Sequence, residues 1–258
     1  MIPKKIHYCW FGGNPLPELA QKCIASWEKY CPDYEIIQWN ESNFDVNCCD
    51  YIKEAYEAKK WAFVSDYARF KILYEQGGLY FDTDVEVLKS LEPIVAKGSF
   101  MGREEGINVN PGLGIGAPAG DPLYEEILSK YATLHFRNAD GSLNMKTVVE
   151  YTTELLKEYG LQVRNEIQCV RKVHIYPKEY FCPMDYATGE LKLTNNSYSI
   201  HHYTASWYDE TQRYALTLKR KYGKILPRRP AAILATAVAK TKCEGIGACI
   251  QWIFQKRK

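Results

Sequence analysis

Two aspartates, Asp82 and Asp84, stand one residue apart directly after the apolar run Leu79, Tyr80 and Phe81. In open α/β sheets, ligands bind beyond the carboxyl ends of the strands, which is where these carboxylates would lie. The one-residue spacing predicts that both side chains project from the same side of an extended segment. Two unpaired carboxylates resist ionising together, and a divalent cation such as Mn²⁺ or Mg²⁺ relieves their repulsion. The pair therefore indicates a metal that holds a phosphorylated substrate, although acidic residues also end strands without any ligand.

Two further stretches contain side chains that suit such a substrate. Asp66 and Arg69 lie three residues apart, on one face of the helix expected before the aspartates; a surface ion pair is the alternative interpretation. Trp10 lies near the end of the expected first strand, separated by one residue from two glycines. Its ring could stack on a nucleobase while Gly12 lets the backbone approach a ligand, or the ring could belong to the core.

A third stretch, "HHYTASW", lies near the end of the expected domain. His201 and His202 could supply an imidazole ligand for a metal, and Ser206 and Trp207 could donate hydrogen bonds to phosphate oxygens. Two adjacent histidines on their own are more often strand or surface residues. The residues by themselves do not choose between His201 and His202.

Strand-like and helix-like segments alternate along the chain. Apolar residues at helical spacing mark the helices, and short apolar runs closed by turn residues mark the strands. Such alternation is typical of an α/β domain with a largely parallel sheet. Gly77 and Gly78 should end the helix before the aspartates, because glycine tolerates the positive φ of a helix C-cap. Strands are expected at residues 2–11, 34–39, 79–81, 173–183 and 197–207, and helices at residues 17–31, 50–60, 61–75, 122–134 and 143–160.

Charge is distributed unevenly along the 258 residues. The net charge is +2, but residues 219–258 contain eleven Lys or Arg against one acid, Glu244. That segment therefore carries +10 and the preceding 218 residues carry −8, which suggests a separate partner for the basic segment. We predict one domain over residues 1–222 and a basic tail over residues 223–258.

Together the quoted stretches resemble glycosyltransferase family 32, the enzymes with a DXD sugar-binding region that include capsule and lipopolysaccharide enzymes. The matching pieces are "IPKKIHYCWFGG", "SWEKYCPDYEIIQWNE", "AFVSDYARFKILYEQGGLYFDTDVEV" and "HHYTASW", in the order of the family, between residues 2 and 207. The resemblance implies a GT-A fold: an α/β, Rossmann-like, mostly parallel sheet flanked by helices. It also implies Mn²⁺ (or Mg²⁺) as cofactor, a nucleotide-sugar donor and retention of the anomeric configuration.

The resemblance assigns roles to individual positions. Asp66, Arg69 and Asp82 are the expected catalytic residues, which hold the sugar and ribose. Asp82, Asp84 and His202 are the expected metal ligands, with His201 as the alternative to His202. Asn108 and Asn110, with the glycines that follow them, could line the sugar pocket or form an ordinary loop. The expected donor-binding residues are Trp10, Gly12, Asp66, Arg69, Tyr80, Asp82, Ser206 and Trp207.

The expected function is metal-dependent, retaining transfer of a sugar, from UDP-hexose or UDP-N-acetylhexosamine, to a surface-polysaccharide or lipid-linked glycan. One alternative is a non-catalytic sugar-binding or membrane adaptor with the same fold. Another is a phosphohydrolase of the haloacid dehalogenase type, although that class places its aspartate motif on the first strand.

The basic tail is expected to lie on a membrane surface. Its longest apolar run, residues 231–239, is too short to span a bilayer, and an amphipathic helix anchored by Trp252 and Phe254 fits better. A helix packed on the domain is the alternative. The acidic domain would repel nucleic acid. Nine cysteines without metal-site spacing and the absence of a signal-peptide pattern favour the cytoplasm, with the enzyme peripheral on the inner face of the membrane.

Overall fold

The computed structural model describes residues 1–204 and 210–255. The chain divides into two compact units, which we describe separately. The sheet unit comprises Met1–Pro183 and Leu193–His202, and the helical unit comprises Met184–Lys192 and Tyr203–Lys258. The predicted boundary after residue 222 therefore differs from the division after His202, because residues 210–222 pack with the helices that follow them.

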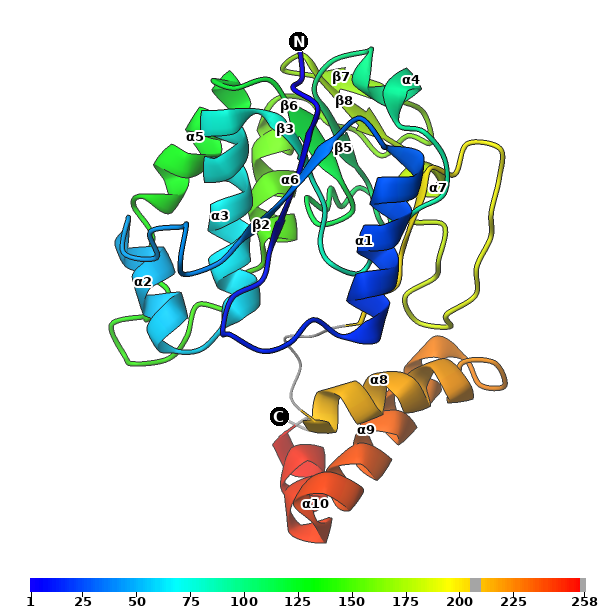
Figure 1. Cartoon of the computed structure of the whole chain (residues 1–258). Helices are drawn as coiled ribbons and strands as arrows, with labels where there is room; N and C mark the ends of the chain where they lie inside the picture. Colours follow the sequence, from blue (N-terminus) through cyan, green and yellow to red (C-terminus); the bar gives the residue numbers. More distant parts are fainter. Residues whose placement is uncertain (205–209, 256–258) are drawn as a thin grey trace. The chain divides into compact units, whose positions relative to one another are not determined.

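The sheet unit is built on seven strands among the described residues: β1 (Lys5–Cys9), β2 (Glu35–Trp39), β3 (Gly78–Tyr80), β5 (Phe100–Gly102), β6 (Ile115–Ala117), β7 (Gln168–Val170) and β8 (Val173–Tyr176). Their order across the sheet is β2-β1-β3-β6-β5-β8-β7 (Figure 1). Strand β1 pairs in parallel with β2 and β3, and β5 with β8, whereas β6 and β7 run antiparallel to their neighbours. Five of the seven strands thus share one direction. The prediction of an α/β fold with a Rossmann-like, mostly parallel sheet is confirmed.

Helices cover both faces of this sheet: α1 (Glu18–Tyr30), α2 (Asp50–Glu57), α3 (Trp61–Gln76), α4 (Glu92–Val95), α5 (Pro122–Tyr131), α6 (Val148–Glu158) and α7 (Lys178–Phe181). Figure 1 shows α2, α3, α5 and α6 on one side and α1 and α7 on the other. Helix α7 begins inside the strand expected at residues 173–183, because Pro177 cannot continue the strand's ladder and precedes the helix.

Helix α3 is buried on nearly all sides rather than on one stripe. Phe63, Phe70 and Leu73 pack in the main hydrophobic cluster, and Asp66 and Arg69 on the same helix are also buried. The helix ends at Gly77, as predicted, where φ is +63°. A Cβ at this position would meet the Ala119 backbone nitrogen at 2.7 Å, so glycine is required by packing as well as by conformation.

A second, two-stranded sheet pairs β4 (Val85–Val87) antiparallel with β9 (Ser199–His201), and Val85 lies opposite His201. Helix α1 packs against β4, and the indole Nε1 of Trp27 donates a 2.7 Å hydrogen bond to the Val85 carbonyl. The pairing joins segments more than 110 residues apart. Of the strand expected at residues 197–207, only Ser199–His201 is strand; residues 205–207 lie outside the described part.

The helical unit contains α8 (Glu210–Tyr222), α9 (Arg228–Glu244) and α10 (Ile246–Gln255), and α9 packs with both of the others. Ala231, Ala235 and Ala239 form a buried stripe at four-residue spacing on α9, which allows close approach of a neighbouring helix. None of the helices in the described residues is long and apolar enough to cross a membrane.

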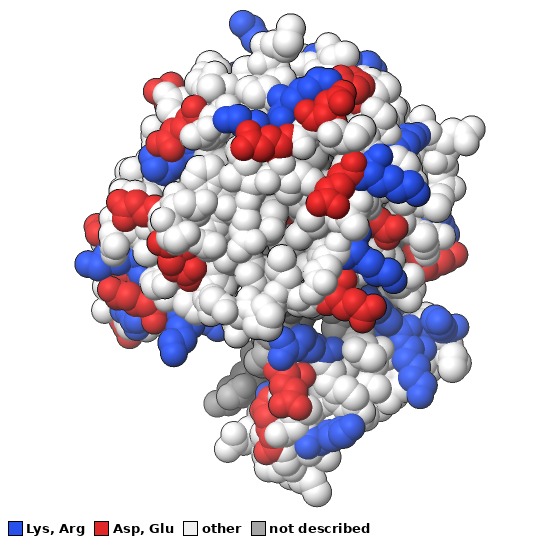
Figure 2. Space-filling view, viewed as in Figure 1, with Lys and Arg blue, Asp and Glu red and all other residues white. Residues whose placement is uncertain are grey.

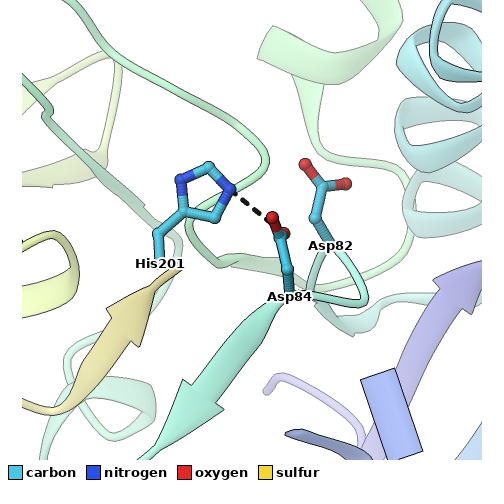
Figure 3. A group of neighbouring side chains, drawn as sticks. All are labelled: Asp82, Asp84 and His201. Carbon is cyan, nitrogen blue, oxygen red and sulfur yellow. Dashed lines mark ion pairs between the residues drawn. The ribbon is translucent and has the colours of Figure 1, made fainter. Parts of the chain in front are cut away.

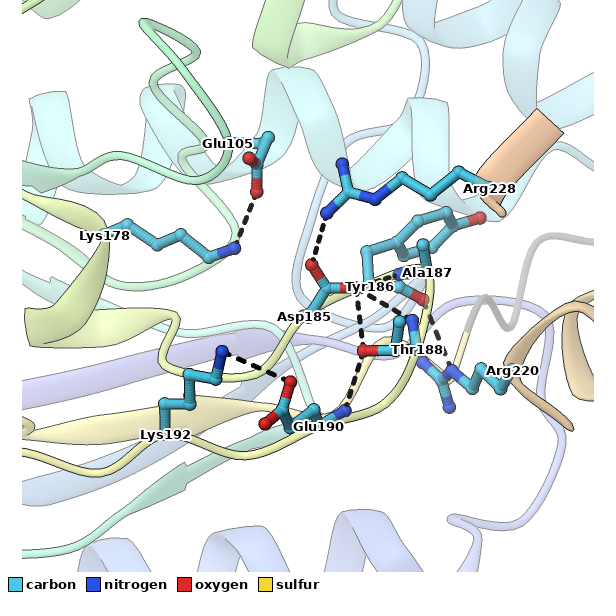
Figure 4. A network of polar contacts seen from close by, with 10 residues as sticks. All are labelled: Glu105, Lys178, Asp185, Tyr186, Ala187, Thr188, Glu190, Lys192, Arg220 and Arg228. Carbon is cyan, nitrogen blue, oxygen red and sulfur yellow. Dashed lines mark hydrogen bonds and ion pairs between the residues drawn. The ribbon is translucent and has the colours of Figure 1, made fainter. Parts of the chain in front are cut away.

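A turn in residues 184–192 belongs to the same unit. The Asp185 carboxylate accepts hydrogen bonds from the backbone nitrogens of Ala187 and Thr188 at 2.9 and 2.8 Å, and Arg228 contacts its other oxygen at 2.9 Å (Figure 4). Asp185 thus both closes the turn and forms an ion pair with Arg228 at the start of α9.

Candidate active site

The two motif aspartates follow β3 but do not lie in an extended segment. Asp82 and Asp84 lie in a turn between β3 and β4, closed by a 3.0 Å hydrogen bond from the Val85 nitrogen to the Asp82 carbonyl. The expectation of strand alternation at these residues is therefore wrong. The turn nevertheless directs both carboxylates toward one place (Figure 3).

His201 completes this cluster from the end of β9. One ligand atom each from Asp82, Asp84 and His201 lies within 4.8 Å of the others, and His201 Nε2 is 3.1 Å from Asp84 Oδ1 (Figure 3). Asp84 and His201 are buried, and Asp82 is partly exposed. Two carboxylates and an imidazole are a donor set that fits a divalent metal ion.

The electrostatics of the cluster follow from this proximity. Burial of His201 opposes protonation, but the Asp84 carboxylate outweighs burial and raises the pKa of the imidazole above its usual value. The carboxylates thus favour a positive charge at this point.

His202, the expected metal ligand, occupies a different place. Its Nε2 lies 2.8 Å from Glu86 Oε2, and its backbone nitrogen donates to the Asp84 carbonyl at 3.0 Å. The structure therefore brings His201, and not His202, to the aspartates. The physical reason is that consecutive residues at the end of a strand project to opposite sides, so the imidazole of His202, directly after β9, is directed away from the cluster that His201 joins.

Arg69 links Asp66 to the aspartate cluster. Its Nη2 is 2.8 Å from Asp66 Oδ1 and 3.3 Å from Asp82 Oδ1, and its Nε donates to the Ser65 carbonyl at 3.0 Å. The Arg69 side chain is only 3% exposed, so this is a buried charge network rather than the alternative of a surface ion pair. Burial raises the pKa of Asp66 to about 7, against the opposing charge of Arg69.

Tyr80 supports the same network. Its hydroxyl donates to Asp82 Oδ1 at 3.1 Å, and the Arg69 guanidinium lies 4.9 Å from the centre of its ring. The residue is 1% exposed. The observed contacts of Tyr80 are therefore with Asp82 and Arg69, and its role in donor binding stays a prediction.

Trp10 and Gly12 follow β1, whose carboxyl end adjoins that of β3 in the parallel pair. Trp10 is half-buried, and its Nε1 donates to the Asn14 carbonyl at 2.6 Å. Gly12 has φ +90°, and a Cβ there would meet the Trp61 indole at 2.7 Å. Packing against Trp61 thus accounts for this glycine without a ligand. Ser206 and Trp207, the remaining expected donor-binding residues, lie outside the described residues.

The loop after β5 supplies residues that the sequence located only in part. Gly112 lies against Asp82: its carbonyl accepts a 3.1 Å hydrogen bond from the Asp82 nitrogen, and a Cβ on it would be 2.0 Å from Asp82 Oδ2. The Asn110 carboxamide accepts from the Gly112 nitrogen at 2.8 Å. Asn108 is exposed. The run of asparagines and glycines was the only sequence signal for this loop, and nothing singled out Glu104, which contacts Asn110.

The two aspartates lie in a region of the chain that matches a known family model. Residues 17–101 match the family model described as "Glycosyltransferase sugar-binding region containing DXD motif". The chain carries the sugar-binding region of the DXD glycosyltransferases. The predicted family is thereby confirmed for this region, which contains Asp66, Arg69, Asp82 and Asp84.

Several named glycosyltransferases are similar to this chain over part or most of its length. Inositol phosphoceramide mannosyltransferase 1 of Schizosaccharomyces pombe is 30% identical over 111 residues, which are 39% of this chain and 33% of that protein. The uncharacterized glycosyltransferase L373 of Acanthamoeba polyphaga mimivirus is 22% identical over 240 residues, 86% of this chain and 90% of that protein. The chain spans only about a third of the length of the yeast mannosyltransferase. A solved structure, the PaToxG glycosyltransferase, aligns with a TM-score of 0.49 and 19% identity over 61% of this chain and 70% of that one.

Proposed function

We propose that this protein is a metal-dependent glycosyltransferase of the GT-A type that moves a sugar from a nucleotide-sugar donor to a glycan acceptor with retention. The observation that carries the proposal is the convergence of Asp82, Asp84 and His201 within 4.8 Å, next to the buried Arg69 network and inside the DXD region. The donor that we propose is UDP-hexose or UDP-N-acetylhexosamine, and the acceptor a surface-polysaccharide or lipid-linked glycan.

The proposed ligands of the metal are Asp82, Asp84 and His201, with His201 taking the place first assigned to His202. Carboxylates suit Mg²⁺ and Mn²⁺ alike, whereas an imidazole favours a transition metal, so the mixed set supports Mn²⁺ over Mg²⁺. When bound, the metal would stabilise the charge that develops on the departing diphosphate.

The residues around the metal site would hold the donor sugar. Asp82, fixed by Arg69 and Tyr80, presents its remaining acceptor capacity to sugar or ribose hydroxyls. Asp66 and Arg69 form a rigid support behind Asp82, which restricts the orientation of the Asp82 carboxylate. Trp10, half-buried after β1, is the proposed stacking surface for the nucleobase. We assign no catalytic base, because front-face attack on a retaining centre does not require one from the enzyme.

The alternative functions fit the site less well. A haloacid dehalogenase-type phosphohydrolase would carry its aspartates on the first strand, whereas here they follow β3. A non-catalytic adaptor would have no use for a buried cluster of two carboxylates and an imidazole beside a buried arginine. The two remaining hypotheses, transferase and adaptor, are separated by turnover.

Donor hydrolysis without an acceptor is the direct test. Purified protein is incubated with Mn²⁺ and a panel of UDP- and GDP-sugars, and released nucleotide is followed. We expect one donor to be hydrolysed, and we expect chelator and Asp84→Asn to abolish the release. Asp33→Asn is the matched control, because that carboxylate is 76% exposed in a surface ion pair.

Two results would contradict the proposal. If no sugar nucleotide is hydrolysed and none binds in the presence of Mn²⁺, the protein is not a transferase of these donors. If hydrolysis persists in Asp84→Asn, the metal site lies elsewhere.

We further propose that the helical unit associates with the inner, anionic face of a membrane, the surface at which a lipid-linked acceptor would be found. Residues 219–258 carry eleven basic residues against one acid, and Figure 2 shows Lys and Arg on the visible face of this unit. Exposed apolar residues follow helical spacing on α10: Ile246, Ile250, Ile253 and Phe254. Basic and apolar side chains together favour an interfacial position. Trp252, the other proposed anchor, is half-buried, and residues 256–258 are outside the described range.

A further inference from the structure

Glu104 reaches the site from the loop after β5, just beyond the end of the matched DXD region at residue 101. It stands two residues after β5, which runs in the same direction as β3, so both strands end at the same edge of the sheet. A hairpin holds it: Glu104 N donates to the Asn108 carbonyl at 2.8 Å, and Asn110 N donates to the Gly102 carbonyl at 3.0 Å. The negative charge of Glu104 is also among those that raise the pKa of His201.

A chain of three hydrogen bonds connects Glu104 to Asp82. Asn110 Nδ2 donates to Glu104 Oε2 at 2.9 Å, Gly112 N donates to Asn110 Oδ1 at 2.8 Å, and Asp82 N donates to the Gly112 carbonyl at 3.1 Å. Gly112 also lies against the Asp82 carboxylate, where no side chain could be accommodated. Any displacement of Gly112 is therefore transmitted both to the backbone and to the side chain of Asp82.

The direction of these bonds is set by Glu104. An ionised carboxylate can only accept, so it must face the NH₂ group of Asn110. The amide oxygen of Asn110 is then turned toward the Gly112 N–H, which needs an acceptor. Without a carboxylate at position 104, the two orientations of the Asn110 amide would differ less in energy, and the wrong one would set NH₂ against N–H.

We propose that Glu104 is a positioning residue which, through Asn110 and Gly112, holds Asp82 in the orientation that the metal and sugar site requires. Glu104 itself need not touch the substrate. The inference rests on the proposed metal site, and it adds β5 to the elements that build that site.

Reversing the polarity of the Glu104–Asn110 bond tests this inference. In Asn110→Asp two carboxylates face each other and repel. In the double variant Glu104→Gln/Asn110→Asp, the new amide at 104 can donate to the new carboxylate at 110, whose other oxygen still accepts from Gly112. Mn²⁺ affinity is measured by electron paramagnetic resonance of the free ion, and folding by circular dichroism and thermal melting.

We expect Asn110→Asp to weaken Mn²⁺ binding by roughly 10–100-fold, the usual effect of losing an outer partner of a metal ligand, and the double variant to recover most of it. Glu104→Gln alone keeps an acceptor and should lose less. Glu105→Gln is the matched control, since its exposed carboxylate pairs with Lys178 at 2.7 Å (Figure 4) and should leave Mn²⁺ affinity unchanged.

Distinct results would overturn the inference and the function on which it rests. Unchanged Mn²⁺ affinity in Asn110→Asp, or a loss that the double variant does not recover, overturns the positioning role while the metal site stands. If Asn110→Asp does not fold, Glu104→Gln decides: affinity equal to wild type overturns the role. Failure of the wild type itself to bind Mn²⁺ overturns the metal site and this inference together.

Discussion

Two arginine–aspartate pairs of almost equal length occupy opposite environments in this chain. In the sheet unit, Arg69 approaches Asp66 to 2.8 Å and is 3% exposed; in the helical unit, Arg228 approaches Asp185 to 2.9 Å and is 64% exposed. Water screens the second pair, and such pairs contribute about 0–1 kcal/mol. The first pair has no such screening, so each charge depends on its partners. Distance alone therefore does not distinguish the pair beside the candidate metal site from the pair on the surface, whereas burial does.

Arg69→Met should cause the largest loss of stability. It leaves Asp66 and Asp82 without their buried counter-charge, and we expect the free energy of unfolding to fall by about 3–5 kcal/mol. Arg228→Met should lower it by about 1 kcal/mol or less. Urea unfolding of both variants measures the difference. Equal losses would show that the contrast in burial has no energetic consequence.

His7 makes the stability of the sheet unit depend on pH. Trp39 Nε1 donates to His7 Nδ1 at 3.0 Å, so Nε2 carries the hydrogen and donates to the Gly77 carbonyl at 2.9 Å. Burial lowers the pKa of His7 to about 4, from 6.5 in the unfolded chain. Between these values the unfolded chain binds a proton at His7 that the folded chain does not, so the contribution of His7 to stability falls as pH falls from 6.5 to 4, by about 3 kcal/mol. Asp66, whose pKa is raised to about 7 by burial, contributes in the opposite direction over the same range, so the comparison of His7→Gln with the wild type isolates the His7 part.

Urea unfolding across this pH range measures the slope. His7→Gln should remove that part of the slope, whereas His135→Gln, which changes an exposed histidine, should retain it. A slope unaffected by His7→Gln would assign the pH dependence to other groups. The helical unit contains no histidine, so its own unfolding should contribute little in this range.

Two glycine substitutions contrast the crowded site with the open helical unit. Gly112→Ala places a methyl group 2.0 Å from Asp82 Oδ2, and we expect Mn²⁺ affinity to fall by roughly 10–100-fold. Gly247→Ala in α10 meets no atom within 4 Å and should instead stabilise its helix by up to about 1 kcal/mol. Calorimetric Mn²⁺ titration and thermal melting distinguish the two. An unchanged affinity in Gly112→Ala would mean that Asp82 can move without cost.

The smallest effect concerns the charge of the helical unit. Lys221 and Lys224 are exposed, and each basic residue near an anionic leaflet contributes about 1 kcal/mol. Replacing each with Gln should weaken co-sedimentation with phosphatidylserine vesicles by roughly fivefold per charge, and added salt should do the same. Lys53→Gln, an exposed lysine of the sheet unit, is the control. Equal sedimentation of all variants would remove the membrane proposal.

Local sequence signals located most of the elements around the site. The helix expected at residues 61–75 is observed as Trp61–Gln76, and the strand expected at 34–39 as Glu35–Trp39. The ends of these two elements could be predicted because Gly77 and Gly78 follow the helix and turn-forming residues follow the strand. The four-residue α4 was not predicted, because a single turn is too short to show a helical period. The division of the chain after His202 was not predicted, because it depends on packing between segments distant in the sequence.

The sequence by itself determined the chemistry of this protein: two aspartates after a buried strand, an Asp–Arg pair on the preceding helix and a histidine pair near the end of the domain, because residue type and local spacing are encoded residue by residue. Only the tertiary structure decided which histidine joins the aspartates, since that depends on the pairing of β4 with β9. The tertiary structure likewise brought Glu104, Asn110 and Gly112 to Asp82. Contacts of this kind arise where distant strands end at one edge of a sheet, and no local pattern records them.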